Sequence, residues 1–153
     1  MVWNLICGII ISIITAVLTV HLSLKRFYSE KRWERKFKVY EDIMTDLHHI
    51  RDDANHQLMS LEKNIEIPED ISIELKNKML AATAELRKHI DIGSFVISEE
   101  AVSALHIFEY ELNKSAEIEI STPKDFVRHY KLKLEAIDKC LEEMRIITKK
   151  DLS

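Results

Sequence analysis

The sequence predicts an all-α protein in which one N-terminal transmembrane helix continues into an antiparallel four-helix bundle. Residues 2–24 carry no formal charge, and a basic cluster begins at Lys25. The 153-residue chain has only two glycines and two prolines, so it holds few of the residues that tight turns require. Beyond the first segment, apolar residues recur at steps of three and four, which is the period of an amphipathic helix.

Residues 1–24 are expected to form the transmembrane helix, which makes the lipid bilayer the first partner. About twenty apolar residues, each rising roughly 1.5 Å along a helix, match the hydrocarbon thickness of a bilayer. A cleaved signal peptide is disfavoured, because the stretch is too long and its end, residues 21–25, lacks a small-x-small cleavage site. Cys7 lies too close to the start to be a convincing lipoprotein cysteine.

The charges that follow the apolar segment predict its orientation. Residues 25–38 contain seven Lys or Arg against two Glu, and the positive-inside rule retains such a flank in the cytoplasm. We therefore expect the N-terminus outside the membrane, residues 25–38 as a basic juxtamembrane stalk, and residues 39–153 as a cytoplasmic helical bundle. The residues expected at the two lipid interfaces are Trp3, Lys25, Arg26, Phe27, Tyr28, Lys31, Arg32 and Trp33.

One face of the apolar segment carries small and hydroxyl side chains. Small residues at every fourth position let two helix backbones approach closely, and hydroxyl groups can hydrogen-bond across such a contact. The alternative is that Ser and Thr bond carbonyls of their own preceding turn and face lipid. We favour self-association, and hence a homo-oligomer. The expected packing face is Gly8, Ser12, Thr15, Ala16, Thr19 and Ser23.

Four amphipathic helices joined by short links are expected to form the bundle. The first continues from the anchor to about Ile65, and the second begins after Pro68 and ends near Gly93. Ser98 is the expected N-cap of the third helix, and Thr122-Pro123 reads as N-cap and first residue of the fourth. The expected apolar stripes are Tyr40, Ile43, Met44, Leu47, Ile50, Ala54, Leu58 and Leu61; Leu75, Met79, Ala82, Leu86 and Ile90; Val102, Leu105, Phe108 and Leu112; and Val127, Tyr130, Leu134, Ile137, Leu141, Met144 and Thr148.

The link between the second and third helices is unusually apolar. Phe95, Val96 and Ile97 are too hydrophobic for a free loop. The favoured interpretation is that they fold down to cap the core. The alternative is an exposed patch that binds a protein partner.

Histidines are numerous, but their spacing does not favour a metal site. The best local set is His49, Asp52, Asp53 and His56, with His48 beside it. These residues fall on the outer side of the expected apolar stripe, so a solvated face with surface charges is the preferred interpretation. No metal and no cofactor are therefore expected.

Catalysis and nucleic-acid binding also lack support in the sequence. No glycine-rich phosphate loop or nucleophile motif is present, and Cys140 lies beside Leu141 on the expected core side of its helix. Residues 39–153 carry 15 basic against 24 acidic residues, and such a balance repels nucleic acid. We expect neither an enzyme nor a nucleic-acid-binding protein.

Two stretches of the chain resemble small bacterial single-pass membrane proteins of uncharacterised function. The first is residues 30–36 (EKRWERK) followed by Tyr40 and Ile43, and the second is residues 92–101 (IGSFVISEEA). The likeness extends over anchor, stalk and bundle, and it implies no functional residue. The favoured function is a non-enzymatic protein that recruits or senses a protein partner at the inner membrane. The alternative is a membrane-perturbing effector, related to phage defence or stress, that acts through oligomerisation of its transmembrane helix.

Overall fold

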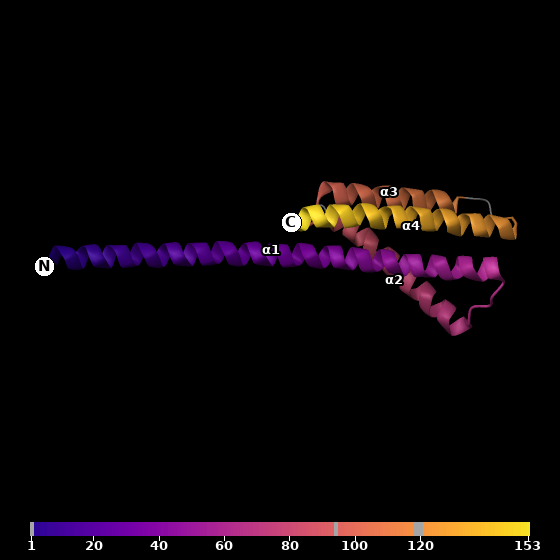
Figure 1. The fold of residues 1–153 in the computed structure, drawn as a ribbon, viewed down its shortest axis with the longest axis horizontal. Coiled ribbons are helices and arrows are strands. Elements are labelled where there is room, and N and C mark those ends of the chain that lie inside the picture. The colour runs from indigo at the N-terminus through magenta and orange to yellow at the C-terminus, as the bar shows by residue number, and fades with distance from the viewer. Residues whose placement is uncertain (1, 94, 118–120) are drawn as a thin grey trace. The chain divides into compact units, whose positions relative to one another are not determined.

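The computed structural model describes the backbone of residues 2–93, 95–117 and 121–153, with side chains from residue 12 onward. Within these ranges the chain is all-α, as the sequence predicts. It consists of α1 (Val2–Lys63), α2 (Glu69–Gly93), α3 (Glu99–Ala116) and α4 (Pro123–Leu152) (Figure 1). Internal contacts divide the chain into an N-terminal unit, residues 1–35, and a bundle unit, residues 36–153.

The expected membrane span over residues 1–24 is not supported by the described side chains. Among them, no helix is both long enough and apolar enough to cross a membrane. Trp3, Cys7 and Gly8, on which the expectation partly rests, lie outside the residues whose side chains are described.

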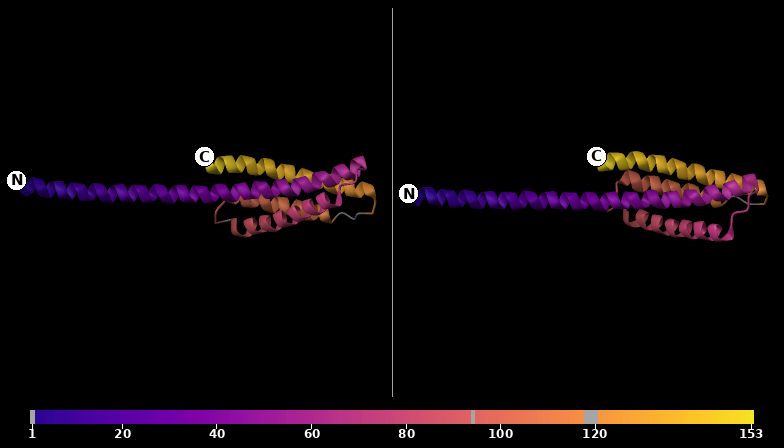
Figure 2. Two further views of the ribbon diagram at one scale, coloured as in Figure 1. Left: turned by 90° about the horizontal axis from the view of Figure 1, so that it is seen from below. Right: turned by 60° about the horizontal axis from the view of Figure 1, so that its bottom comes forward.

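The bundle unit is an antiparallel four-helix bundle made of the second half of α1 with α2, α3 and α4 (Figure 2). Helices α3 and α4 lie side by side, and an ion pair between Arg87 and Glu109, at 3.2 Å, joins α2 to α3. The order of contacts shows that α4 runs antiparallel to α1. The contacts that define this direction are Lys36–Asp151 at 3.1 Å, Arg51–Asp138 at 2.6 Å and Glu62–Lys131 at 2.7 Å.

The core takes one apolar stripe from each helix, and the buried residues together with the half-buried ones packed against them include most of the expected positions. Ile97, from the link between α2 and α3, joins it. Leu61 is a correction, because 39% of it is exposed. The buried apolar residues are Tyr40, Ile43, Leu47, Ile50, Ala54, Ala82, Leu86, Ile90, Ile97, Ala101, Ala104, Leu105, Phe108, Ile137, Cys140 and Met144.

The exposure of Leu61 follows from the unequal lengths of the helices. Arg87 of α2 faces Glu109 of α3, and α3 ends at Ala116, about seven residues further on. Helix α2 begins at Glu69, about 18 residues before Arg87. The first turns of α2 therefore extend beyond the end of α3, and they diverge from the end of α1 (Figure 1), so this end of α1 lacks the cover of both helices.

The helix ends follow the capping signals of the sequence. Asn64, with a φ of 50°, turns the chain after α1. The Ser98 hydroxyl accepts a hydrogen bond from the backbone N–H of Ala101 at 3.3 Å and so caps α3. Thr122 opens α4 with a capping box, and Pro123 is the first helical residue. These caps satisfy N–H groups that have no partner within the helix.

Candidate functional site

Residues 12–24 of α1 present a surface of large aliphatic side chains, which we call the aliphatic surface. Its members are between 48% and 63% exposed. Large aliphatic side chains exposed over a wide arc of an uncharged helix segment are typical of a helix that is buried in protein or in lipid rather than one exposed to water. The members are Ile13, Ile14, Val17, Leu18, Val20, Leu22 and Leu24.

The expected packing face of small residues lies on the same part of α1. Ser12, Thr15, Ala16, Thr19 and Ser23 are all exposed, whereas residue 8 lies outside the described side chains. The Thr19 hydroxyl donates to the Thr15 carbonyl at 2.8 Å, which is the bond within one helix that the alternative interpretation expects. This bond does not obstruct close packing of the small side chains, and self-association stays a prediction.

The basic segment that follows is also exposed. Arg26 pairs with Glu30 at 2.9 Å and Lys31 with Glu34 at 2.6 Å, and each of these side chains is at least half exposed. Such pairs one turn apart contribute only about 0.3–0.5 kcal/mol each. They stabilise the helix locally and leave the excess of five positive charges over residues 25–38 unchanged.

The aromatic residues expected at the lipid interface lie among these charges. Phe27 and Tyr28 make an edge-to-face contact with ring centroids 5.9 Å apart, and the Lys31 ammonium lies 5.9 Å from the centre of the Phe27 ring. Trp33 is 49% exposed. Mixed aromatic and basic surfaces of this kind are typical of residues at the headgroup level of a membrane.

Within the bundle unit, a group of polar contacts around Asp151, near the end of α4, connects α4 with α1 and with the start of α3. The hydroxyl of the buried Tyr40 donates to the Asp151 carboxylate, and Lys36 Nζ lies 3.1 Å from Asp151 Oδ2. The backbone N–H of Ser98, at the start of α3, donates to the Tyr40 hydroxyl at 3.4 Å. Burial raises the pKa of Tyr40, and hydrogen bonds from Tyr40 and Lys36 outweigh burial and lower the pKa of Asp151.

A second polar contact lies inside the bundle and corrects the expectation that Asp53 is a surface charge. Asp53 is 4% exposed and Lys133 is 8% exposed, with Lys133 Nζ 3.7 Å from Asp53 Oδ2. The ammonium also lies 5.9 Å from the centre of the Tyr130 ring. Burial lowers the pKa of Lys133, because removal from water disfavours its charged form.

The described histidines and the buried Cys140 form no metal-binding cluster within the described side chains. Among the residues with described side chains, no three His, Cys, Asp or Glu residues lie close enough to hold one metal ion. His56 donates through Nδ1 to the Asp52 carbonyl, and His129 donates to the Ser115 carbonyl, both at 2.8 Å. Burial raises the pKa of the Cys140 thiol to about 12, so this group is a neutral thiol at pH 7 and not a nucleophilic thiolate.

The apolar link between α2 and α3 divides into an inner and an outer part. Ile97 is 6% exposed and packs in the core, where its Cδ1 lies so near Gly93 that an added Cβ there would come within 3.0 Å. Val96 is half-buried. Phe95 is 88% exposed, so of the three residues it alone offers a whole side chain to a partner.

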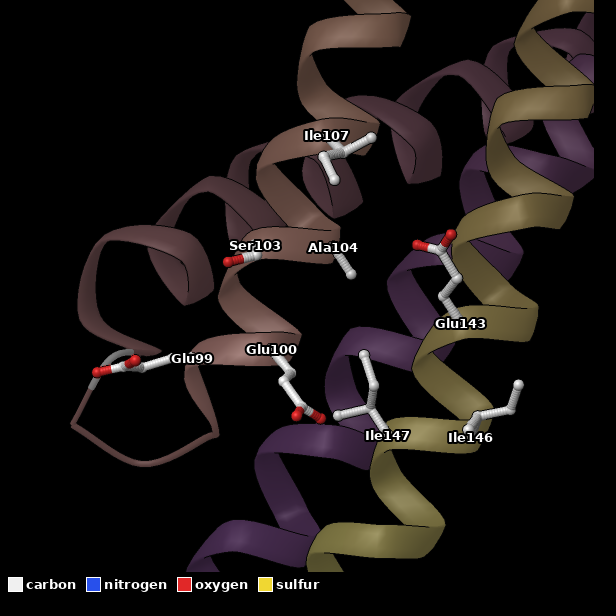
Figure 3. Close-up of a pocket in the computed structure, with 8 residues that line it drawn as sticks. All are labelled: Glu99, Glu100, Ser103, Ala104, Ile107, Glu143, Ile146 and Ile147. Atoms are coloured by element: carbon white, nitrogen blue, oxygen red, sulfur yellow. The ribbon is translucent and has the colours of Figure 1, made fainter.

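A groove of about 530 Å³ runs between α3 and α4 (Figure 3). Ile107 and Ile146 are 50% and 61% exposed on its two sides, and Glu100 and Glu143 project toward the gap between the helices. Sequence reasoning missed this groove because it considered only the buried stripes. The sequence signal that could have indicated the groove is one isoleucine outside the expected apolar stripe on each of the two helices, Ile107 on α3 and Ile146 on α4. The lining residues are Glu99, Glu100, Ser103, Ala104, Ile107, Glu143, Ile146 and Ile147.

No family model matches the chain, and neither a curated protein nor a solved structure is significantly similar to it. The described residues themselves define the class. It is an all-α protein with a four-helix bundle, and its first helix also carries an exposed aliphatic surface followed by a basic segment.

Proposed function

We propose that the chain is a non-enzymatic, membrane-anchored protein whose helical bundle recruits or senses a protein partner at a bacterial inner membrane. The single observation that carries this proposal is the aliphatic surface of residues 12–24, which continues the uncharged run of residues 2–24. Fully burying one large aliphatic side chain is worth about 1.5–3 kcal/mol. Seven such side chains, already half buried by their own helix, still give a driving force on the order of 5–10 kcal/mol toward an apolar environment.

Lipid is the environment that the flanking residues favour. The aliphatic side chains are followed directly by Lys25 and Arg26, and residues 25–38 have five more basic than acidic residues. A basic flank contributes about 1 kcal/mol per cation near an anionic membrane surface. The same flank orients the anchor, with the N-terminus outside and the bundle inside. The proposed anchor self-associates through its small residues, which makes the protein a homo-oligomer.

In this proposal, the bundle is the part of the chain that binds the protein partner. It holds a packed core, so it provides a stable surface, and its candidate contact features are the exposed Phe95 and the groove between α3 and α4.

The second candidate, a membrane-perturbing effector that works by oligomerisation, draws on the hydroxyl side chains of Ser12, Thr15, Thr19 and Ser23 on α1. These groups would line an assembly of helices. The bond from Thr19 to the Thr15 carbonyl occupies one hydroxyl donor, which makes this candidate the weaker one. A membrane-potential dye distinguishes the two, because the effector collapses the potential on overexpression and the recruiting protein does not.

Extraction of membranes with alkaline carbonate tests the anchor. The wild-type chain is expected to remain in the pellet, and a Val17→Asp/Leu18→Asp variant is expected to move to the supernatant. Ile73→Asp, at a residue of α2 with 53% exposure, is the matched control and should stay in the pellet. Extraction of the wild-type chain would contradict the proposal.

A further inference from the structure

The groove between α3 and α4 combines an apolar lining with acidic margins. Ala104 and Ile147 are buried or half-buried between the helices, while Ile107 and Ile146 stand more exposed. Exposed apolar side chains near a gap between two packed helices are candidates for contact with another molecule. The groove extends from Glu99 to Ile107 along α3, which is about 12 Å at 1.5 Å per residue.

Every charged residue that lines this groove is acidic. They are Glu99, Glu100 and Glu143, and Glu100 already accepts two hydrogen bonds from Lys150, at 2.7 and 2.9 Å. The Lys150–Glu100 pair is exposed, with 66% and 58% of the two side chains accessible, so it holds Glu100 only weakly. Residues 39–153 as a whole also contain more acidic than basic residues.

We propose that this groove binds a cationic amphipathic helix of a partner protein. This inference rests on the proposed function and names the chemistry of the partner. A helix that lies along two packed helices presents apolar side chains at positions i, i+3 or i+4, and i+7, and two helical turns match the 12 Å length. Lys or Arg beside these anchors meets the glutamates, and complementary charge selects the partner and speeds its association.

A designed peptide provides the probe. The full chain is placed in nanodiscs of zwitterionic lipid and titrated with a fluorescein-labelled 18-residue peptide of Leu and Lys arranged with helical period. Empty nanodiscs give the blank for binding to lipid. Fluorescence anisotropy should show saturable binding, and a peptide of the same pattern with Glu in place of Lys should bind at least tenfold more weakly. Equal affinity for the two peptides would overturn the proposal.

Variants locate the binding site. Ile107→Ser/Ile146→Ser and, separately, Glu100→Gln/Glu143→Gln should each weaken binding of the Leu/Lys peptide about tenfold. Ile73→Ser/Glu74→Gln is the matched control, since Ile73 and Glu74 form a similarly exposed apolar and acidic pair on α2, and it should stay within twofold of wild type. Wild-type affinity in both groove variants, or an equal loss in the control, would overturn the proposal. Circular dichroism verifies that each variant is folded.

The main alternative occupant is the basic segment, residues 25–38, of a second copy of the chain. If the groove variants abolish chemical cross-linking between copies but leave peptide binding unchanged, that alternative replaces the proposal. Failure of this inference is separate from failure of the proposed function. A chain that resists carbonate extraction but binds no Leu/Lys peptide keeps its anchor and loses only this partner.

Discussion

The buried pair between Asp53 and Lys133 gives the sharpest prediction about stability. Removing one partner leaves a charge in the core, whereas replacing both removes the cost of desolvation altogether. We expect Asp53→Leu alone to lower the free energy of unfolding by about 3–5 kcal/mol. The double variant Asp53→Leu/Lys133→Met, which keeps the branching of the first side chain and roughly the length of the second, should lie within about 1 kcal/mol of wild type or be more stable.

The magnitudes follow from the geometry. At 3.7 Å, two unit charges attract each other by about 4 kcal/mol at an effective dielectric constant of 20. Taking the two groups out of water costs several kcal/mol for each ion, so the attraction offsets only part of the desolvation cost. Loss of Asp53 removes the attraction, while Lys133 must remain buried or lose its proton, in keeping with the lowered pKa of Lys133.

Urea denaturation of the full chain in a non-denaturing detergent at pH 7, followed by circular dichroism at 222 nm, provides the measurement. Asp138→Leu is the control, because Asp138 pairs with Arg51 at 2.6 Å but is 53% exposed, and it should cost less than about 1 kcal/mol. Equal costs for Asp53→Leu and Asp138→Leu would refute the reasoning. So would a double variant as unstable as Asp53→Leu alone.

Three further predictions concern the described polar groups. In a Cys7→Ser background, Cys140 should react with dithionitrobenzoate at pH 8 at least about 100-fold more slowly in the folded chain than in urea. The reason is that the folded chain raises the pKa of the Cys140 thiol to about 12 and so removes the reactive thiolate. Equal reaction rates in the folded and unfolded chain would contradict this prediction. Asp151→Asn should cost about 1–3 kcal/mol at pH 7. Because the folded chain lowers the pKa of Asp151 below its ordinary 3.8, that stabilisation is complete above the ordinary pKa and is lost as the pH falls through the lowered one. The difference between variant and wild type in urea titrations should therefore shrink from pH 5 to pH 2, and a constant difference would argue against the assignment. Ser98→Ala should lower the unfolding free energy by about 1 kcal/mol, since the hydroxyl caps α3, and an unchanged melting curve would count against this role.

Local signals in the sequence were enough to predict the helices and most of their buried faces. Ser98 and Thr122-Pro123 marked the starts of α3 and α4, because capping depends on residues only three positions apart. The spacing of apolar residues similarly selected the core, since one face of a helix repeats every three to four residues.

Features that depend on the register between helices were not predictable in the same way. The burial of Asp53 requires Lys133, and the position of Asp151 requires Tyr40, and these partners lie 80 and 111 residues apart. The exposure of Leu61 likewise depends on where α3 ends beside α2. The groove went unnoticed for the same reason, because it is formed by α3 and α4 together.

The central claim is that residues 2–24 lie in lipid while the bundle lies inside the cell. Labelling with a membrane-impermeant maleimide tests it most directly, using Val17→Cys and Ser153→Cys in a Cys7→Ser/Cys140→Ala background. We predict that Ser153→Cys reacts only after the cells are opened, and that Val17→Cys reacts only after detergent dissolves the membrane. Labelling of Val17→Cys in opened cells without detergent, or of Ser153→Cys in intact cells, would contradict the account.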